Sequence, residues 1–183
     1  MVKKIVIIGP ESTGKSSLSK QLANHYQTVW VPEYARQFLL EHGTQYTFND
    51  LLLIAKGQMQ LEESIILQAK NNLVFIDTNM YVMKVWSEFV FNDAHQWVLE
   101  QISDKEYDLY LLCNVDLPWI KDDLREYPDL EIRKELYHIY KDIMMNQEVP
   151  WVEISGNYEE RLHAAIIAVD NILKGSAVCH SSK

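Results

Sequence analysis

A glycine-rich segment near the N-terminus has the residue types and the spacing of a phosphate-binding loop. Residues 9–16 read Gly-Pro-Glu-Ser-Thr-Gly-Lys-Ser and match G-x-x-x-x-G-K-[ST] at every fixed position. The glycines let the backbone turn so that N–H groups point at phosphate oxygens, and a following helix adds its positive N-terminal end. We expect Lys15 to reach the β- and γ-phosphates of a nucleotide and Ser16 to ligate Mg²⁺. The predicted nucleotide-binding residues of this loop are Gly9, Glu11, Ser12, Thr13, Gly14, Lys15, Ser16 and Ser17.

A carboxylate is expected at the same place in the fold. Asp77 follows an apolar run of strand length, residues 73–76, and ligands of open α/β sheets bind at the carboxyl ends of the strands. Asp77 is predicted to hold the Mg²⁺ shell or to take the proton of an acceptor; a residue that only caps a helix is the alternative. No Glu follows Asp77, and residues 114–116 lack the lysine of a guanine-binding motif. The pattern therefore favours phosphoryl transfer to a small acceptor over nucleotide hydrolysis.

The segment Pro-Glu-Tyr-Ala-Arg, residues 32–36, follows the second expected strand and opens on the same edge of the sheet. Glu33 is predicted to bind acceptor hydroxyls or to act as the base, and Arg36 to contact the transferred phosphoryl group. Tyr34 lies between them and is included in the predicted acceptor site. A surface Glu–Arg pair on one helix face is the alternative interpretation.

Residues 116–125 are polar around a few apolar anchors and contain Arg125, with Arg133 further along the chain. We expect this segment to close over the phosphates as a lid, because closure excludes water and favours the acceptor over hydrolysis. The residues assigned to catalysis are Lys15, Glu33, Asp77 and Arg125.

These residues require a sheet that brings several strand ends together. Short apolar runs at residues 4–8, 28–31, 73–76, 109–113 and 151–154 alternate with helical patterns, which predicts an α/β fold with a parallel sheet covered on both faces. Helix starts are predicted at Thr47, Asp93 and Asn157, the first helix ending near residues 71–72. A further helix is expected between Asp129 and Asn146.

Composition restricts the class of partner. The chain has 183 residues, 17 Lys+Arg and 26 Asp+Glu, so its net charge of −9 argues against nonspecific binding to a nucleic-acid polymer. No stretch approaches the about 18 apolar residues of a membrane span, and a cytoplasmic protein without membrane contacts is expected. We expect one domain over residues 1–173 and a disordered polar tail over residues 174–183.

Taken together, the motifs resemble the kinase domain of the NadR family, the ribosylnicotinamide kinases. The resemblance rests on the loop at residues 9–16, Pro-Glu-Tyr-Ala-Arg, Phe-Ile-Asp-Thr at 75–78, the lid segment 116–125, and residues 154–161. It implies a P-loop kinase-like five-stranded parallel sheet with a small lid. It also implies ATP and Mg²⁺ as cosubstrates and phosphorylation of the 5′-hydroxyl of nicotinamide riboside, a step of NAD salvage.

Carried over by position, the resemblance assigns Lys15 and Ser16 to ATP–Mg²⁺, Asp77 to the metal or base role, and Glu33 and Arg36 to the acceptor. Arg125 and Arg133 would belong to the lid, and Gly156 and Tyr158 to the adenine side.

The sequence departs from the family pattern in two ways. It lacks the His-x-Gly-His motif of members that are also adenylyltransferases, so it is expected to make the mononucleotide only. The residue before Glu-Tyr, commonly aromatic in the family, is Pro32. A flat cationic ring would then need another aromatic partner. The candidates are Trp30, Tyr34, Tyr46, Phe48, Trp86 and Trp119.

The alternatives are a kinase for another nucleoside or vitamin-like alcohol, and a non-catalytic ATP-dependent binding or regulatory protein. All three functions involve a small molecule rather than a polymer.

Overall fold

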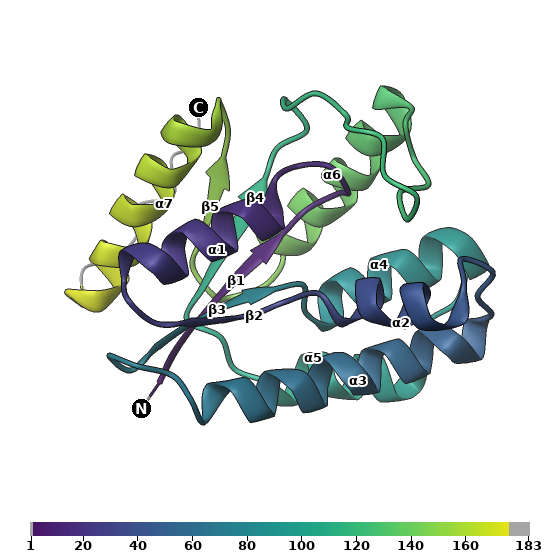
Figure 1. Ribbon diagram of the computed structural model, residues 1–183, viewed down its shortest axis with the longest axis horizontal. Helices are drawn as coiled ribbons and strands as arrows, with labels where there is room; N and C mark the ends of the chain where they lie inside the picture. The colour runs from purple at the N-terminus through teal and green to yellow at the C-terminus, as the bar shows by residue number, and fades with distance from the viewer. Residues whose placement is uncertain (1, 176–183) are drawn as a thin grey trace.

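A computed structural model describes residues 2–175 of the chain (Figure 1). The tail predicted for residues 174–183 lies outside the described residues from residue 176 onward. The elements, in chain order, are β1 (Lys3–Ile8), α1 (Lys15–His25), β2 (Val29–Val31), α2 (Tyr34–His42), α3 (Phe48–Ile66), β3 (Leu73–Asp77), α4 (Met80–Phe91), α5 (Gln96–Asp104), β4 (Leu109–Cys113), α6 (Leu130–Met145), β5 (Trp151–Ile154) and α7 (Tyr158–Leu173).

The five strands form one parallel sheet in the order β2-β3-β1-β4-β5. The central strand β1 has β3 on one side and β4 on the other, and residues 5–8 are fully buried. From β1 the chain adds strands first on one side of the sheet, as β2 and β3, and then on the other side, as β4 and β5. The loop that follows β1 therefore lies at the switch point of the strand order, where such sheets bind ligands. The predicted fold class and the positions of all five strands are confirmed.

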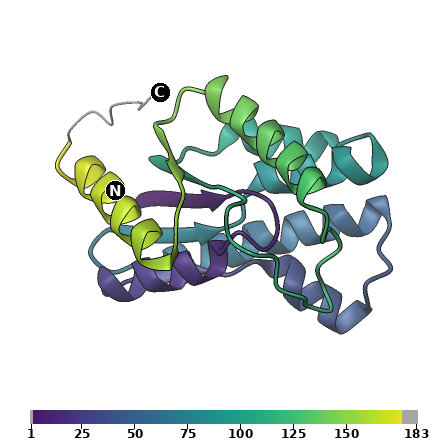
Figure 2. The same ribbon diagram turned by 90° about the horizontal axis from the view of Figure 1, so that it is seen from above.

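Helices cover both faces of the sheet. Apolar residues of α1 and α7, such as Leu22 and Val169, pack against one face. Val85 of α4 and Leu136 of α6 pack against the other, and a further cluster joins α2, α3, α4 and α5 beyond the sheet. Figure 2 shows α1 and α7 on one side of the strands and α4 and α6 on the opposite side. This layering leaves the carboxyl ends of the strands uncovered except by loops.

Two of the three helix starts predicted from capping residues are confirmed. Thr47 and Asn157 form capping boxes at α3 and α7, as predicted, and Asp129 caps α6. The predicted start at Asp93 is wrong. Its carboxylate accepts a bond only from the neighbouring Ala94 N–H, and α5 begins three residues later.

Helix α3 also ends earlier than predicted, at Ile66. Asn71 and Asn72 have positive φ angles of 56° and 53°, which turn the chain into β3 and are incompatible with a continuing right-handed helix. Within residues 2–175, no helix has the length and apolarity that crossing a bilayer requires.

Candidate active site

The loop of residues 9–16 joins β1 to α1 and has the backbone geometry that its glycines predict. Gly9 has φ 136°, and a Cβ atom there would lie 2.7 Å from the carbonyl oxygen of Cys113. Gly14 has φ 80° and occupies the N-cap of α1, where it supplies no side chain. The N–H groups of the first turn of α1 are therefore left for a ligand, which is the arrangement that binds phosphate.

The side chain of Lys15 folds back over this loop. Its Nζ donates to the carbonyl oxygen of Pro10 at 2.8 Å, and the hydroxyl of Thr13 donates to the same oxygen at 2.8 Å. The ammonium group is thus held above the loop by one carbonyl. A nucleotide phosphate offers a charged acceptor at this place, and hydrogen bonds between charged groups are about twice as strong as neutral ones.

Asp77 ends β3 and is the most perturbed acid of the site. It is fully buried, and neither carboxylate oxygen has a hydrogen-bond partner among the described residues. Burial, and then the charge of Glu33, raise its pKa from 3.8 to about 7, while Lys15 and Ser16 oppose the rise. Thr78, which follows, has φ 81°, a strained conformation for a β-branched residue, and an unpartnered buried hydroxyl. Perturbed acids and strained backbone of this kind are typical of functional sites.

The segment after β2 supplies the opposite wall. Glu33 is the N-cap of α2, but its side chain makes no capping hydrogen bond. Arg36, one turn into the same helix, forms a two-bond ion pair with Asp122 of the lid at 2.9 and 3.2 Å. The alternative of a Glu33–Arg36 surface pair is therefore wrong: Arg36 connects the acceptor side of the site to the lid.

The lid segment is docked on the phosphate loop (Figure 2). The carboxylate of Glu11 accepts bonds from the indole of Trp119 and from the backbone N–H groups of Glu126 and Tyr127, at 2.7 to 3.2 Å. The Ser12 hydroxyl accepts the N–H of Ile120 at 3.0 Å. The variable positions of the phosphate loop thus hold the lid, a role that the pattern G-x-x-x-x-G-K-[ST] does not specify.

These elements enclose a cavity of about 390 Å³ at the carboxyl ends of β1, β2 and β3. Thirteen of the residues predicted to bind nucleotide or acceptor line it, together with an aromatic wall that includes Trp30, Trp86, Phe89, Tyr127 and Tyr140. The thirteen are Gly9, Glu11, Ser12, Thr13, Gly14, Lys15, Ser16, Ser17, Glu33, Arg36, Asp77, Arg125 and Tyr158.

Several predicted residues are not part of the cavity wall. They are Tyr34, Arg133 and Gly156, and the aromatic candidates Tyr46, Phe48 and Trp119. The Tyr34 ring packs against Gly57 of α3, so it serves the fold of the acceptor segment rather than the cavity. Gly156 bonds through its backbone to Asp116 and Arg161. Arg133 is buried on α6, three and seven residues before Leu136 and Tyr140, which line the cavity. Its Nε and Nη1 have no hydrogen-bond partner among the described residues, and its place at the cleft stays a prediction.

The guanidinium of Arg161 was not predicted to have a role and turns out to connect three loops of the site. It donates to the carbonyl of Thr13 in the phosphate loop, to that of Asn114 after β4 and to that of Gly156 after β5, at 2.7 to 3.0 Å. It also pairs with Asp116, and it is 2% exposed. The motif at residues 154–161 includes this arginine, but its partners are distant in sequence.

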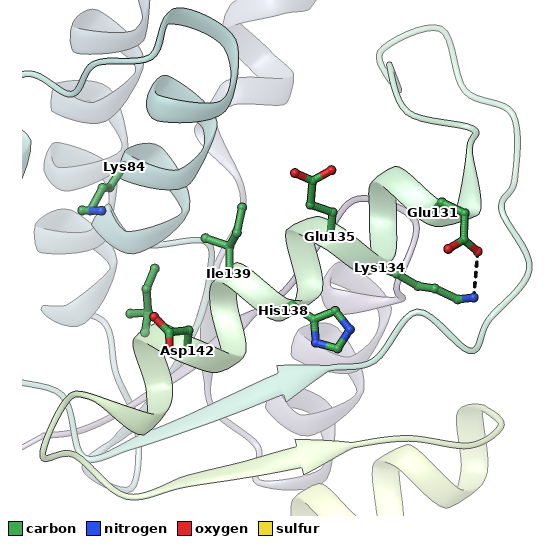
Figure 3. A pocket seen from close by; sticks show the side chains of 8 residues that line it. Lys84, Glu131, Lys134, Glu135, His138, Ile139 and Asp142 are labelled. Carbon is green, nitrogen blue, oxygen red and sulfur yellow. Dashed lines mark hydrogen bonds and ion pairs between the residues drawn. The ribbon is translucent and has the colours of Figure 1, made fainter.

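A second hollow lies along the outer face of α6 and reaches Lys84 of α4 (Figure 3). Its volume is about 650 Å³, but Lys134 is paired with Glu131 at 2.8 Å and Lys84 with Glu88 at 2.6 Å. None of its side chains is buried. Without a desolvated group, this hollow lacks the electrostatic features of the cavity at the strand ends.

Comparison with known proteins shows which family the chain resembles. A family model described as an AAA domain matches residues 4–161. The trifunctional NAD biosynthesis/regulator protein NadR of Escherichia coli (strain K12) is 28% identical over 165 residues, which cover 87% of this chain and 40% of that protein. NadR of Salmonella typhimurium (strain LT2) is 26% identical over 177 residues, 94% of this chain and 43% of that protein. The chain thus spans less than half the length of these relatives.

Solved structures agree on the fold. NadR protein in complex with NR superposes with a TM-score of 0.73 at 22% identity, over 100% of this chain and 52% of that chain. NadR in complex with NAD and AMP-PNP gives 0.68 at the same identity and coverage. Thymidylate kinase from Ehrlichia chaffeensis gives 0.64 at 14% identity, over 94% of this chain and 98% of that chain. With the family match over most of its length, the chain belongs to the AAA domain family and is a homologue of NadR, which confirms the resemblance inferred from its motifs.

Proposed function

We propose that this protein is a kinase that transfers the γ-phosphoryl group of ATP to the 5′-hydroxyl of nicotinamide riboside, giving nicotinamide mononucleotide. The observation that carries the proposal is the shared cavity, which places the phosphate loop, the buried Asp77 and Glu33 around one space beside an aromatic wall. The NadR structures were solved with NR and with AMP-PNP, ligands of the two kinds that such a cavity would take. We assign the activity to residues 1–173.

Nucleotide binding would use the loop around Lys15. The backbone N–H groups and the ammonium would neutralise the phosphates, and Tyr158, which lines the same cavity beside Gly14, would face the adenine side. Positioning and charge neutralisation supply most of the acceleration in phosphoryl transfer, so these contacts are the main catalytic contribution of the loop.

The oxygen donors present fit Mg²⁺. Both buried carboxylate oxygens of Asp77 lack a hydrogen-bond partner within residues 2–175, and Ser16 lies beside them. The described residues contain no cluster of three His, Cys, Asp or Glu side chains, and Mg²⁺ commonly needs only one or two protein ligands besides water and phosphate oxygens. When bound, the ion would neutralise charge on the β- and γ-phosphates. Asp77 and Ser16 are the residues that would hold it.

The acceptor would lie between Glu33 and the aromatic wall. Its hydroxyl oxygen attacks the γ-phosphorus, the bond to the bridging oxygen of ADP breaks, and the hydroxyl proton passes to a carboxylate, Asp77 or Glu33. Arg36 and Arg125 line the same cavity and would approach the transferred group when their present partners are exchanged. Trp30 and Trp86 are the candidates for stacking on the nicotinamide ring that line it; Trp86 is held by a 2.8 Å bond from its indole to Tyr46.

ADP release against a panel of acceptors tests the proposal. Nicotinamide riboside should give the largest acceptor-dependent rate, and mass spectrometry should find the mononucleotide. A larger rate with another nucleoside or vitamin-like alcohol would show that nicotinamide riboside is not the preferred acceptor. ATP binding without any acceptor dependence would instead indicate a non-catalytic ATP-dependent binding protein.

A further inference from the structure

The backbone at the start of α2 is hydrogen-bonded to a side chain of another helix. Glu33 occupies the N-cap with φ −67° and ψ 112°, the position at which a side chain usually accepts a bond from its own helix, yet it makes no such bond. The N–H of Tyr34, the first residue of α2, instead donates to Oε1 of Gln58 at 2.7 Å. The Nε2 of Gln58 donates to the carbonyl oxygen of Pro32 at 3.2 Å. One amide from α3 therefore satisfies the backbone on both sides of Glu33.

The residue before Gln58 provides the space for this contact. Gly57 lies within α3, where glycine costs about 1 kcal/mol relative to alanine. A Cβ atom at Gly57 would lie 2.1 Å from Cε1 of Tyr34, so the tyrosine ring rests directly on the helix backbone. Gln58 is 1% exposed, and an amide this deeply buried keeps both of its bonds, because leaving either partner unpaired is costly.

The consequence concerns the carboxylate of Glu33. It accepts no hydrogen bond from the described residues, and it lines the cavity on the acceptor side. Burial first, and the charge of Glu33 second, raise the pKa of both Asp77 and Tyr140, which belong to different walls of the cavity. A carboxylate at the N-cap is attracted to the N–H groups of the second and third residues of its helix, here Ala35 and Arg36. The backbone at Glu33 must therefore be held in a conformation that directs the carboxylate elsewhere if it is to serve a substrate.

We propose that Gln58, with Gly57, is a positioning residue that holds the backbone on both sides of Glu33 and so keeps the Glu33 carboxylate directed to the acceptor rather than to the N–H groups of its own helix. The inference rests on the proposed function in one respect, namely that Glu33 binds the acceptor. The positioning of Glu33 itself can be tested without any substrate.

A double-mutant cycle on thermal stability tests whether Gln58 holds Glu33 away from its own helix. In the wild-type background, Glu33→Ala should change Tm little, because the carboxylate accepts no hydrogen bond from the described residues. In the Gln58→Met background, Glu33 should turn to cap its own helix, and Glu33→Ala should then lower Tm by a further about 2–4 °C, the usual effect of losing an N-cap in a chain of this size. Gln60→Met, an exposed glutamine on the same helix, is the matched control and should leave the effect of Glu33→Ala unchanged. Equal effects of Glu33→Ala in both backgrounds would overturn the proposal.

Kinetics test the consequence for the acceptor. Gln58→Met should raise KM for nicotinamide riboside about tenfold, the loss expected when one hydrogen-bonded contact is misplaced, and leave KM for ATP within about twofold. Gly57→Ala, which displaces Tyr34 without touching the amide, should act in the same direction and serves if Gln58→Met folds poorly. If both KM values rise together, the effect is general loss of structure and the proposal is wrong. If the wild type phosphorylates no acceptor, the proposed function fails, and the stability cycle alone decides whether Gln58 positions Glu33.

Discussion

Replacing Asp77 by asparagine should abolish phosphoryl transfer and, at the same time, stabilise the ligand-free fold above neutral pH. The carboxyl group is fully buried without a hydrogen-bond partner among the described residues, and its pKa is raised from 3.8 to about 7, by burial first and by Glu33 second. In the unfolded chain the same group ionises at its ordinary pKa. Above about pH 7 the native state therefore carries a buried charge that Lys15 and Ser16 offset only in part, and asparagine has nearly the same shape without that charge.

The sign and size follow from linkage. Between about pH 4 and pH 7 the native carboxyl of Asp77 holds a proton that the unfolded one has released, so the wild type loses stability as the pH rises through this range. A pKa difference of about three units corresponds to about 4 kcal/mol. We expect Asp77→Asn to exceed the wild type in unfolding free energy by about 2 kcal/mol at about pH 5.5 and by about 4 kcal/mol at about pH 8.5.

Urea unfolding followed by circular dichroism, in EDTA and without nucleotide, measures this difference. Asp104→Asn, at an exposed carboxylate, is the matched control and should stay within about 0.5 kcal/mol of the wild type at every pH. Excess Mg²⁺ should narrow the advantage of Asp77→Asn, because the ion would stabilise the ionised wild-type group. An advantage that does not change with pH, or a variant less stable than the wild type at about pH 8.5, would refute the reasoning.

Two further variants test the phosphate loop. Lys15→Ala should abolish ADP release while circular dichroism shows an unchanged fold, because the ammonium contacts only the Pro10 carbonyl in the ligand-free protein; full activity would contradict its assigned role. Arg161→Met should lower the unfolding free energy by about 3–5 kcal/mol in urea and weaken ATP binding in calorimetry, since it leaves buried acceptors in three loops unpaired. Arg36→Met, which removes an exposed ion pair, should cost at most about 1 kcal/mol, and equal losses in the two variants would count against the connecting role of Arg161.

The features that sequence predicted correctly are those that depend on neighbouring residues. Residues 5–8 and 109–113 are continuous apolar runs, and the structure buries them as central parallel strands. The phosphate loop was predictable because its two required glycines adopt backbone angles that other residues avoid. Thr47 and Asn157 were predictable as helix starts because a capping box is complete within four residues.

The features that sequence missed depend on partners far along the chain. Arg161 bonds to the Thr13 carbonyl across 148 positions, and Gln58 bonds to Tyr34 and Pro32 across 24 and 26. No periodicity or motif reports such a pairing. One local signal was present: Gly57 interrupts an otherwise good helical sequence, and a glycine in a helix interior usually has a packing reason. Here the reason is the Tyr34 ring.

Although the net charge of the chain is −9, three cationic side chains line the cavity, namely Lys15, Arg36 and Arg125. Each cation that lines it has a partner among the described residues: Lys15 bonds to the Pro10 carbonyl, Arg125 to the Ile120 carbonyl, and Arg36 to Asp122. Two of these partners belong to the lid. A nucleotide that recruits the cations must exchange protein acceptors for phosphate oxygens, so phosphate binding and rearrangement of the lid become a single event. Since the exchange trades neutral carbonyls for charged oxygens at Lys15 and Arg125, it favours a ligand with several negative charges. An acidic protein can therefore select a polyphosphate at one site while its remaining surface repels anionic polymers.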